Sequence, residues 1–166
     1  TFRNFGTIIA SGTLQFGRET FVNDGEIDLG QGVASLTVQR FGPQPIDLMF
    51  TDTAALRVDL TVSGASDSLD VLGTLTLDGM LDVSLLDTAA FDPSVVYTII
   101  TATQITGEFA NAQSSGSGIA TGVQMNGLPF DVIYPQSAVK IANLLHAHRA
   151  LVLAGITGVA AVRRRR

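Results

Sequence analysis

The sequence predicts an all-β protein built as a parallel β-solenoid, which ends in a capping segment and a short apolar helix. Apolar and polar residues alternate in short runs up to about residue 140, and Gly, Asn and Asp separate the runs. These runs recur at a spacing of about 20 residues, within the range typical of repeat architectures. After Ile141 the sequence changes abruptly to an apolar segment rich in Gly and Ala. A length of 166 residues fits one domain, or part of one.

The alternating runs predict the individual strands. Each run places apolar side chains on one face and polar side chains on the other, which is typical of a strand buried on one side. The expected strands cover residues 36–38, 56–60, 69–71, 75–77, 81–85 and 97–100.

A short motif, F-x-N-x-G-x-I, occurs twice near the N-terminus, first from Phe2 and again from Phe21. In a solenoid Asn4 and Asn23 would stack at one corner, where a side-chain amide bonds to the neighbouring coil. Gly6 and Gly25 would supply the positive φ of the bend that follows each asparagine. The motif therefore predicts a repeated corner in the first two coils.

The spacing of the motif continues more loosely from Leu36 to Leu56 and on to Leu75. A coil of about 20 residues with three short strands cannot bury its apolar face alone, so it must stack on the next coil. We therefore expect solenoid coils over residues 1–85. The alternative is a β-sandwich in which each Asn-x-Gly forms an ordinary hairpin turn.

The segment 86–141 is less regular and is expected to cap the stack. An open solenoid end exposes strand edges and an apolar interior, which invites aggregation. The bulky residues expected to cover this end are Phe91, Tyr97, Phe109, Phe130 and Tyr134.

Residues 66–141 also follow a longer order of motifs. The order begins S-D-x-L-x-V-x-G-x-L-x-L-x-G-x-L-x-V-x-L, continues through a Phe and a Pro to Y-T-I-I-T-A and I-T-G-x-F, and ends L-P-F-x-V-x-Y with a later Val. This order resembles the C-terminal end of autotransporter-type passenger domains and related secreted β-helix proteins. The resemblance implies a right-handed parallel β-helix on an exported bacterial protein without a catalytic site, and it assigns no functional residue.

The tail, residues 142–166, is predicted to be an apolar helix followed by a basic end. Its uncharged part, residues 150–162, is shorter than the roughly 20 residues that span a bilayer. The tail is similar to the PEP-CTERM-type sorting segments of exported bacterial proteins, although no Pro-Glu-Pro precedes the helix. The alternative is a helix packed on the solenoid, whose dipole favours cations at its end. The basic end consists of Arg163, Arg164, Arg165 and Arg166.

The body of the chain is acidic, because four of the 10 basic residues stand at the very end, after residue 162, whereas all 15 acidic residues precede it. This balance excludes nucleic acid as an expected partner, since phosphate binding needs clustered basic side chains. The absence of cysteine excludes disulfides and thiol catalysis, but it fits a secreted bacterial protein as well as a cytosolic one.

We expect no cofactor and no metal-binding residues. His146 and His148 lie two positions apart, so on a helix they would point to different sides. A calcium site built from neighbouring coils is a weaker alternative, because the Gly-Gly-x-Gly-x-Asp repeat of calcium-binding β-rolls is absent. Its candidate ligands are Asp67 and Asp70 with Asp47 or Asp52.

We also expect no catalytic residues, although some parallel β-helices act on polysaccharides. Asp70, Asp78 and Asp82 could share an outer face, and two of them could act as general acid and base. Trp is absent and both Tyr fall in the expected cap, so the aromatic platforms of sugar sites are missing. A β-helix carbohydrate-active enzyme is therefore an alternative rather than the main expectation.

The expected function is a non-catalytic structural or adhesin scaffold module, located outside the cell or at the bacterial cell surface in association with the outer membrane. A further alternative is a self-assembling filament subunit that stacks head to tail. The expected partners are a second copy of the chain, host or matrix glycans, and the membrane through the tail. A start at Thr1 without Met, in the middle of a repeat, indicates a processed product or a fragment.

Overall fold

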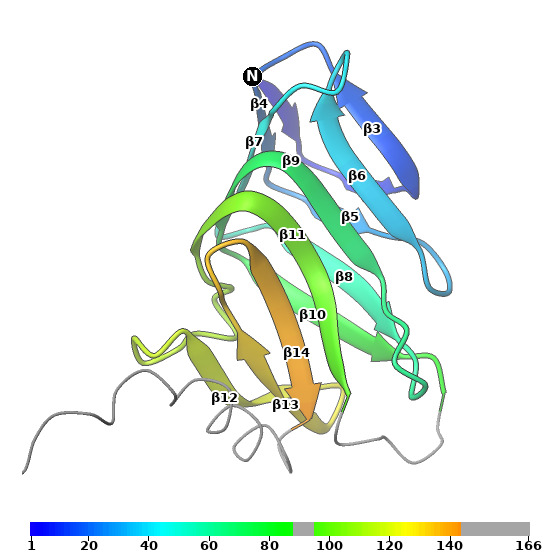
Figure 1. The fold of residues 1–166 in the computed structure, drawn as a ribbon, viewed down its shortest axis with the longest axis vertical. Helices are drawn as coiled ribbons and strands as arrows, with labels where there is room; N and C mark the ends of the chain where they lie inside the picture. Colours follow the sequence, from blue (N-terminus) through cyan, green and yellow to red (C-terminus); the bar gives the residue numbers. More distant parts are fainter. Residues whose placement is uncertain (88–94, 144–166) are drawn as a thin grey trace, which may run out of the picture.

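The computed structural model describes residues 1–87 and 95–143. These residues form fourteen strands and no helix, and the parallel strands stack as a β-solenoid (Figure 1), which confirms the predicted fold class. The strands are β1 (Phe2–Asn4), β2 (Thr7–Ile9), β3 (Gly12–Phe16), β4 (Thr20–Asn23), β5 (Glu26–Asp28), β6 (Ser35–Arg40), β7 (Asp47–Phe50), β8 (Ala55–Leu60), β9 (Ser68–Leu77), β10 (Met80–Leu85), β11 (Val96–Gly107), β12 (Ile119–Met125), β13 (Leu128–Ile133) and β14 (Ala138–Asn143).

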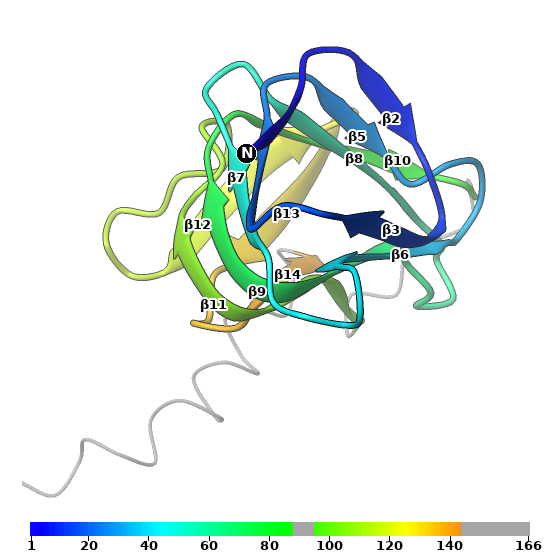
Figure 2. The ribbon, with the colours of Figure 1, turned by 90° about the horizontal axis from the view of Figure 1, so that it is seen from above.

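Each coil contributes strands to three faces that enclose the interior, as Figure 2 shows from above. The first face contains β1, β4, β7 and the later halves of β9 and β11. The second face contains β2, β5, β8 and β10. The third face contains β3, β6 and the earlier halves of β9 and β11, so the two long strands bend through a corner.

Columns of apolar side chains, one residue per coil, fill the interior. Every member of these columns is at most 2% exposed, and burial of a side chain of this size stabilises the fold by roughly 1.5–3 kcal/mol. The columns are Phe21, Leu48 and Leu75 on the first face, Ile27, Leu56 and Leu81 on the second, and Leu36, Leu69 and Ile100 on the third.

The first two coils pair at the step that the motif predicts, with Phe2 beside Phe21. The predicted continuation from Leu36 to Leu56 to Leu75 is wrong, because these three leucines lie on the third, second and first faces respectively. The coils grow longer along the chain, since the loop at residues 29–34 between β5 and β6 and the loop at residues 41–46 between β6 and β7 are longer than their counterparts in the first coil. Phe21 therefore stacks on Leu48, which is well beyond the expected step of about 20 residues.

The pairing changes direction at the lower end of the stack. Parallel pairing continues through β11, which lies on β9 as far as Gly107 beside Leu77. On its other side β11 pairs antiparallel with β14, and β13 and β12 follow, also antiparallel. Three antiparallel strands thus cover this end of the larger sheet.

The β-sandwich alternative predicted hairpin turns at the Asn-x-Gly sites. The strands on either side of these turns do not pair with each other, because β1 pairs with β4 and β2 with β5, all in parallel. No helix in the described part of the chain is long and apolar enough to cross a membrane. The predicted start of the tail helix is wrong, because Ala142 and Asn143 belong to β14, and the remaining residues of the tail, 144–166, lie outside the described residues.

Candidate functional site

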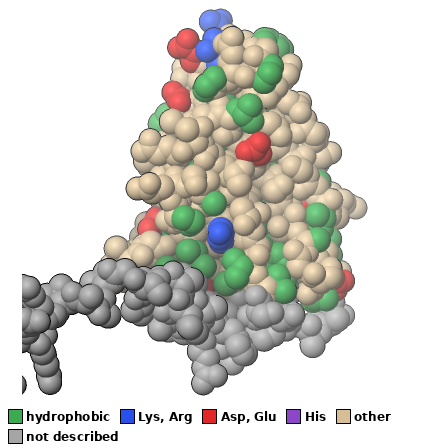
Figure 3. All heavy atoms as spheres, viewed as in Figure 1, with side chains coloured by type: hydrophobic (Ala, Val, Ile, Leu, Met, Phe, Trp, Pro, Cys, Tyr) green, Lys and Arg blue, Asp and Glu red, His purple; other side chains and the backbone are tan. Residues whose placement is uncertain are grey.

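The upper end of the stack, at the top of Figure 1, consists of β1, β2 and β3, and each of these strands is the last of its face. Among the described residues no further strand pairs with their outer edges. Phe5 and Ile9 are 75% and 71% exposed here, and Phe2 is 42% exposed. Figure 3 shows hydrophobic side chains beside charged ones at this end. Such an unpaired edge is a template for the addition of strands.

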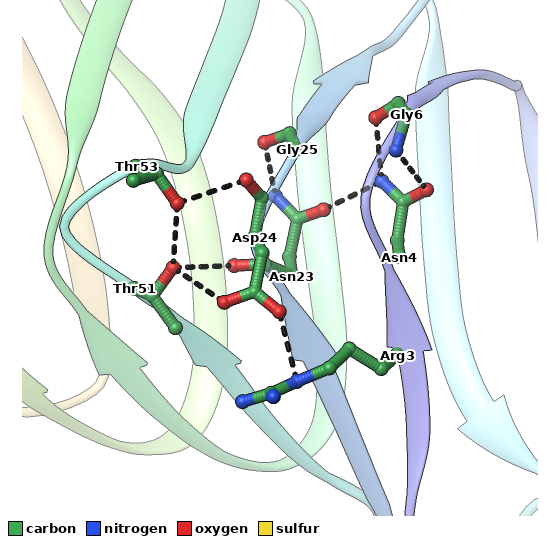
Figure 4. Close-up of polar contacts among 8 residues, drawn as sticks. All are labelled: Arg3, Asn4, Gly6, Asn23, Asp24, Gly25, Thr51 and Thr53. Carbon is green, nitrogen blue, oxygen red and sulfur yellow. Dashed lines mark hydrogen bonds and ion pairs between the residues drawn. The ribbon is translucent and has the colours of Figure 1, made fainter.

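The two motif asparagines lie at the corner between the first and second faces (Figure 4). The Asn4 side-chain amide donates to Asn23 Oδ1 at 2.8 Å and to the carbonyl oxygen of Gly6 at 2.9 Å. Asn23 donates in turn to the carbonyl oxygen of Gly25 at 2.9 Å. Because the Asn23 side chain is buried, these bonds satisfy an amide that water cannot reach. Side chains therefore link the first two coils in addition to the backbone.

Asp24 connects three coils at the same corner (Figure 4). Arg3 Nε in the first coil lies 2.8 Å from Asp24 Oδ2. Thr51 Oγ1 in the third coil donates to Asp24 Oδ1 at 2.9 Å, and Thr53 Oγ1 donates to the Asp24 carbonyl oxygen at 3.0 Å. The Asp24 side chain is therefore engaged by structural partners through both of its oxygens.

The two motif glycines do not serve the role that the sequence predicted. Neither Gly6 nor Gly25 has a positive φ, so that prediction is wrong. Gly25 is required because a Cβ atom there would lie 2.1 Å from the carbonyl oxygen of Gly6 in the coil above. Glu26 N donates to this same oxygen at 2.8 Å, which draws the two coils together. At Gly6, a Cβ atom would meet nothing within 4 Å among the described residues.

Asparagine side chains cover the edge of β10, which is the last strand of the second face. Asn111 Nδ2 donates to the carbonyl oxygen of Leu81 at 2.8 Å, and Asn111 Oδ1 accepts from Leu81 N at 3.0 Å. Asn126 Nδ2 donates to the carbonyl oxygen of Val83. A side-chain amide offers the same donor and acceptor as a peptide group. The two asparagines therefore take the place of a neighbouring strand.

Aromatic side chains fill the space inside the cap. Tyr97, Phe109 and Phe130 are buried and Tyr134 is partly buried. The Tyr134 hydroxyl donates to the carbonyl oxygen of Ala112 at 2.8 Å and accepts from Phe109 N at 3.3 Å. Burial raises the pKa of Tyr134 above its ordinary value, so the hydroxyl keeps its proton and remains a donor. Of the aromatic residues expected in the cap, Phe91 lies outside the described residues.

Arg57 lies on the outer surface of the second face, between acidic residues of the coils above and below. Its Nη1 atom is 3.3 Å from Glu26 Oε1 and 3.9 Å from Asp28 Oδ2, and its Nε atom is 3.2 Å from Asp82 Oδ2. The hydrogen bond to Glu26 and the surrounding carboxylates raise the pKa of Arg57. The arginine thus offsets the repulsion among three carboxylates stacked on one face.

Asp67 is a buried carboxylate that joins two loops. Its Oδ1 atom accepts from Ala34 N at 2.6 Å, and its Oδ2 atom accepts from Asp59 N at 2.7 Å. Burial raises the pKa of Asp67, while the two N–H donors act in the opposite direction. An open pocket lies beside this carboxylate and is lined also by Arg57 and Gly32. Asp67 ties together the segments that precede β6 and β9.

The three acids considered for acid and base catalysis have separate partners. Asp70 in β9 accepts from Thr101 Oγ1 at 2.6 Å, whereas Asp82 lies in the other sheet beside Arg57. Asp78 accepts from the adjacent Gly79 N at 2.7 Å. The structure therefore does not bring these three carboxylates together.

Three of the four calcium candidates have structural partners, because Asp67 and Asp70 make the bonds described above and Asp47 accepts from Thr74 Oγ1 at 2.5 Å. Over the described ranges, no group of three or more His, Cys, Asp or Glu side chains could hold a metal ion. The histidines at 146 and 148 and the four terminal arginines lie outside the described residues.

Sequence reasoning missed the residues that close the lower end. Asn126 and Gly127 have φ of 49° and 79°, and they form the tight turn between β12 and β13. The Asn-Gly pair is a strong hairpin signal, so this turn could have been found. Asn111 carries no comparable signal, because its partner Leu81 is 30 residues away.

Comparison with known proteins adds no family to this description. No protein-family model matches the chain, and no curated protein matches it significantly.

Proposed function

We propose that this protein is a non-catalytic structural module that forms the closed end of a β-solenoid stalk or adhesin scaffold, exported to the bacterial cell surface or beyond. The observation that carries this proposal is the difference between the two ends of the stack. Three antiparallel strands and the amides of Asn111 and Asn126 cover the lower end, whereas β1, β2 and β3 leave the upper end as a strand edge. A module with these ends terminates a rod.

The interior supports a mechanical role. The apolar columns run through successive coils without interruption, so each coil is stabilised mainly by its neighbours. On the surface, Asp24, Asp70 and Asp82 are each bonded to a residue of an adjacent coil. These surface carboxylates stabilise the contacts between coils, as expected for a scaffold.

The expected location outside the cell follows from the two sequence resemblances. The order of motifs in residues 66–141 resembles autotransporter-type passenger domains, and the tail is similar to sorting segments of exported bacterial proteins. Host or matrix glycans are the partners that such a scaffold would bind. The lower end argues against a filament that grows head to tail, because among the described residues the edges of the last parallel strands, β10 and β11, are covered by Asn111, Asn126 and β14.

The location can be tested by cysteine labelling, since the chain has no cysteine of its own. We expect the Gln113→Cys variant of the full protein, expressed in its native host, to react with a membrane-impermeant maleimide on intact cells as fully as after lysis. Gln113 is exposed, whereas the adjacent Ala112 is buried, so Ala112→Cys is the matched control that should stay unlabelled in the folded protein. Labelling of Gln113→Cys that appears only after lysis would contradict the surface location.

A further inference from the structure

We propose that the upper end is a docking edge for one further parallel solenoid coil that carries the motif F-x-N-x-G-x-I. This inference names the partner of the open end in the proposed function, and it does not depend on where the protein is located in the cell. Its evidence is that three kinds of contact between the first two coils have an unused counterpart at the upper end.

The first contact is the close approach at the corner glycine. Gly25 lies under the carbonyl oxygen of Gly6, and Gly79 lies under the carbonyl oxygen of Ala54, where a Cβ atom would be 2.1 Å and 2.2 Å away. Gly6 occupies the same corner position one coil higher, but nothing described lies above it. Glycine is unfavourable in an ordered segment unless the backbone or a neighbour requires it. A coil docked above would supply that neighbour.

The second contact is a column of backbone hydrogen bonds. Ala55 N donates to the carbonyl oxygen of Gly25 at 2.9 Å, and Glu26 N donates to the carbonyl oxygen of Gly6 at 2.8 Å. Thr7 pairs with Glu26 and is the next member of this column. Because the donors of a parallel ladder repeat in the same direction, Thr7 N is the donor that would meet the corner glycine of a docked coil.

The third contact consists of the side-chain ladders. Asn23 Oδ1 accepts from Asn4, whereas Asn4 Oδ1 accepts a longer bond of 3.2 Å from Gly6 N, which leaves a lone pair for an asparagine above. Phe2 packs on Phe21 at 5.3 Å between ring centroids, yet it remains 42% exposed. A coil with the same motif would continue both ladders and bury the Phe2 ring.

A second copy of this chain fits the edge less well. Its lower end is covered, so it cannot present a parallel coil, and a two-fold arrangement would set the upper ends against each other in antiparallel pairing. Pairing of β1 with its copy around its central residue would place Arg3 opposite Arg3 and Asn4 opposite Phe2. Like charges directly opposite each other are destabilising, and the asparagine ladder would be broken.

The test adds a coil to the intact chain. A copy of residues 1–19 is fused in front of Thr1, with Val in place of the copied Arg3 because Val22 is the residue that pairs with Arg3. The junction then repeats the natural step from Glu19 to Thr20. We expect amide hydrogen exchange at Thr7 to slow by about tenfold or more, because this N–H becomes part of an internal ladder. A fused segment of the same composition in scrambled order is the control, and it should leave exchange at Thr7 unchanged.

Gly6→Ala distinguishes a docked coil from a segment that merely lies nearby. In the natural chain we expect this substitution to change the melting temperature by less than about 1 °C, because the added methyl group meets open space. In the lengthened chain we expect a fall of about 3 °C or more, since the methyl group would collide with the docked backbone. Gly25→Ala in the natural chain should show the same fall and serves as the reference.

The proposal would be overturned if exchange at Thr7 were unchanged in the lengthened chain, or if the scrambled segment protected Thr7 equally. It would also be overturned if Gly6→Ala were neutral in both chains. Failure of the lengthened chain to fold, when the chain with the scrambled segment folds, would overturn it too. Sedimentation of the natural chain as a dimer that Arg3→Glu alters would overturn it as well, by assigning the edge to a second copy. None of these results depends on surface labelling at Gln113, so this inference and the proposed location can fail separately.

Discussion

At the scale of single residues, Asp67 is a buried carboxylate held entirely by the backbone. Both carboxylate oxygens accept short bonds from backbone N–H groups, from Ala34 in one segment and Asp59 in another. We expect Asp67→Ala to lower the free energy of unfolding at neutral pH by about 1–3 kcal/mol, because two buried N–H groups then lose their acceptor. Urea unfolding followed by circular dichroism measures this loss.

The same substitution carries a pH dependence with a defined sign. Burial raises the pKa of Asp67 above its ordinary 3.8, so in the acid range the folded protein holds more protons than the unfolded chain. The contribution of Asp67 to stability therefore falls as the pH rises above 3.8, and it levels off above the raised pKa. The advantage of wild type over Asp67→Ala should shrink from about pH 3 to pH 7, and an advantage that grows over this range would contradict the raised pKa.

Residue contacts could be predicted from the sequence only where the spacing itself repeats. Asn4 and Asn23 lie at equal places in two copies of one motif, so their stacking follows from the repeat. The bond from Ala34 to Asp67 joins segments 33 residues apart, and neither segment repeats the other. The function of Gly25 was also beyond sequence reasoning, because it depends on how closely the Gly6 carbonyl oxygen approaches.

At the scale of elements, the edge of β10 is closed by side chains rather than by a strand. We expect Asn111→Ala to lower the free energy of unfolding by about 1–3 kcal/mol, because both the N–H and the carbonyl oxygen of Leu81 lose their partner. Amide hydrogen exchange at Leu81 should speed up at the same time. Urea unfolding measures the loss of stability, and mass spectrometry measures the exchange. The matched control is Gln113→Ala, which removes an exposed amide from the same loop.

We expect Gln113→Ala to change stability by less than about 0.5 kcal/mol, as is usual for an exposed site. If Asn111→Ala were equally silent, the Asn111 amide would not be closing the β10 edge. A large effect of Gln113→Ala would show that the loop as a whole, rather than one amide, protects the strand.

The strands themselves were easier to predict than their partners. Alternation of apolar and polar residues marks one buried face, and that pattern survives whatever the length of the connecting loops, as in Leu81 to Leu85. Stacking partners depend on loop length, so the loops at 29–34 and 41–46 shifted every later column away from the step of the first two coils. The antiparallel pairing of β11 with β14 also left no periodic signal, since it occurs once.

At the scale of the whole molecule, the two ends of the stack decide how it associates. A heterologous contact propagates only if both complementary surfaces are free, and here the lower one is covered by Asn111, Asn126 and three antiparallel strands. The upper edge alone can accept a coil but cannot build a filament from identical subunits. The protein should therefore bind to the end of another solenoid through its upper edge, and no further coil should stack on its lower end.

Removal of the lower cover should change this behaviour. We expect the wild-type chain to sediment as a monomer at all concentrations. The double variant Asn111→Ala, Asn126→Ala should associate as its concentration rises, because its exposed β10 edge can pair with the upper end of another subunit. Adding Gly6→Ala should suppress this association, since the methyl group obstructs a backbone docked above it while leaving the folded monomer intact. Analytical ultracentrifugation with negative-stain electron microscopy distinguishes the outcomes. Fibres formed by the wild-type chain would show that the lower end is not closed. If the double variant associated equally well with and without Gly6→Ala, its subunits would be joining without the upper edge.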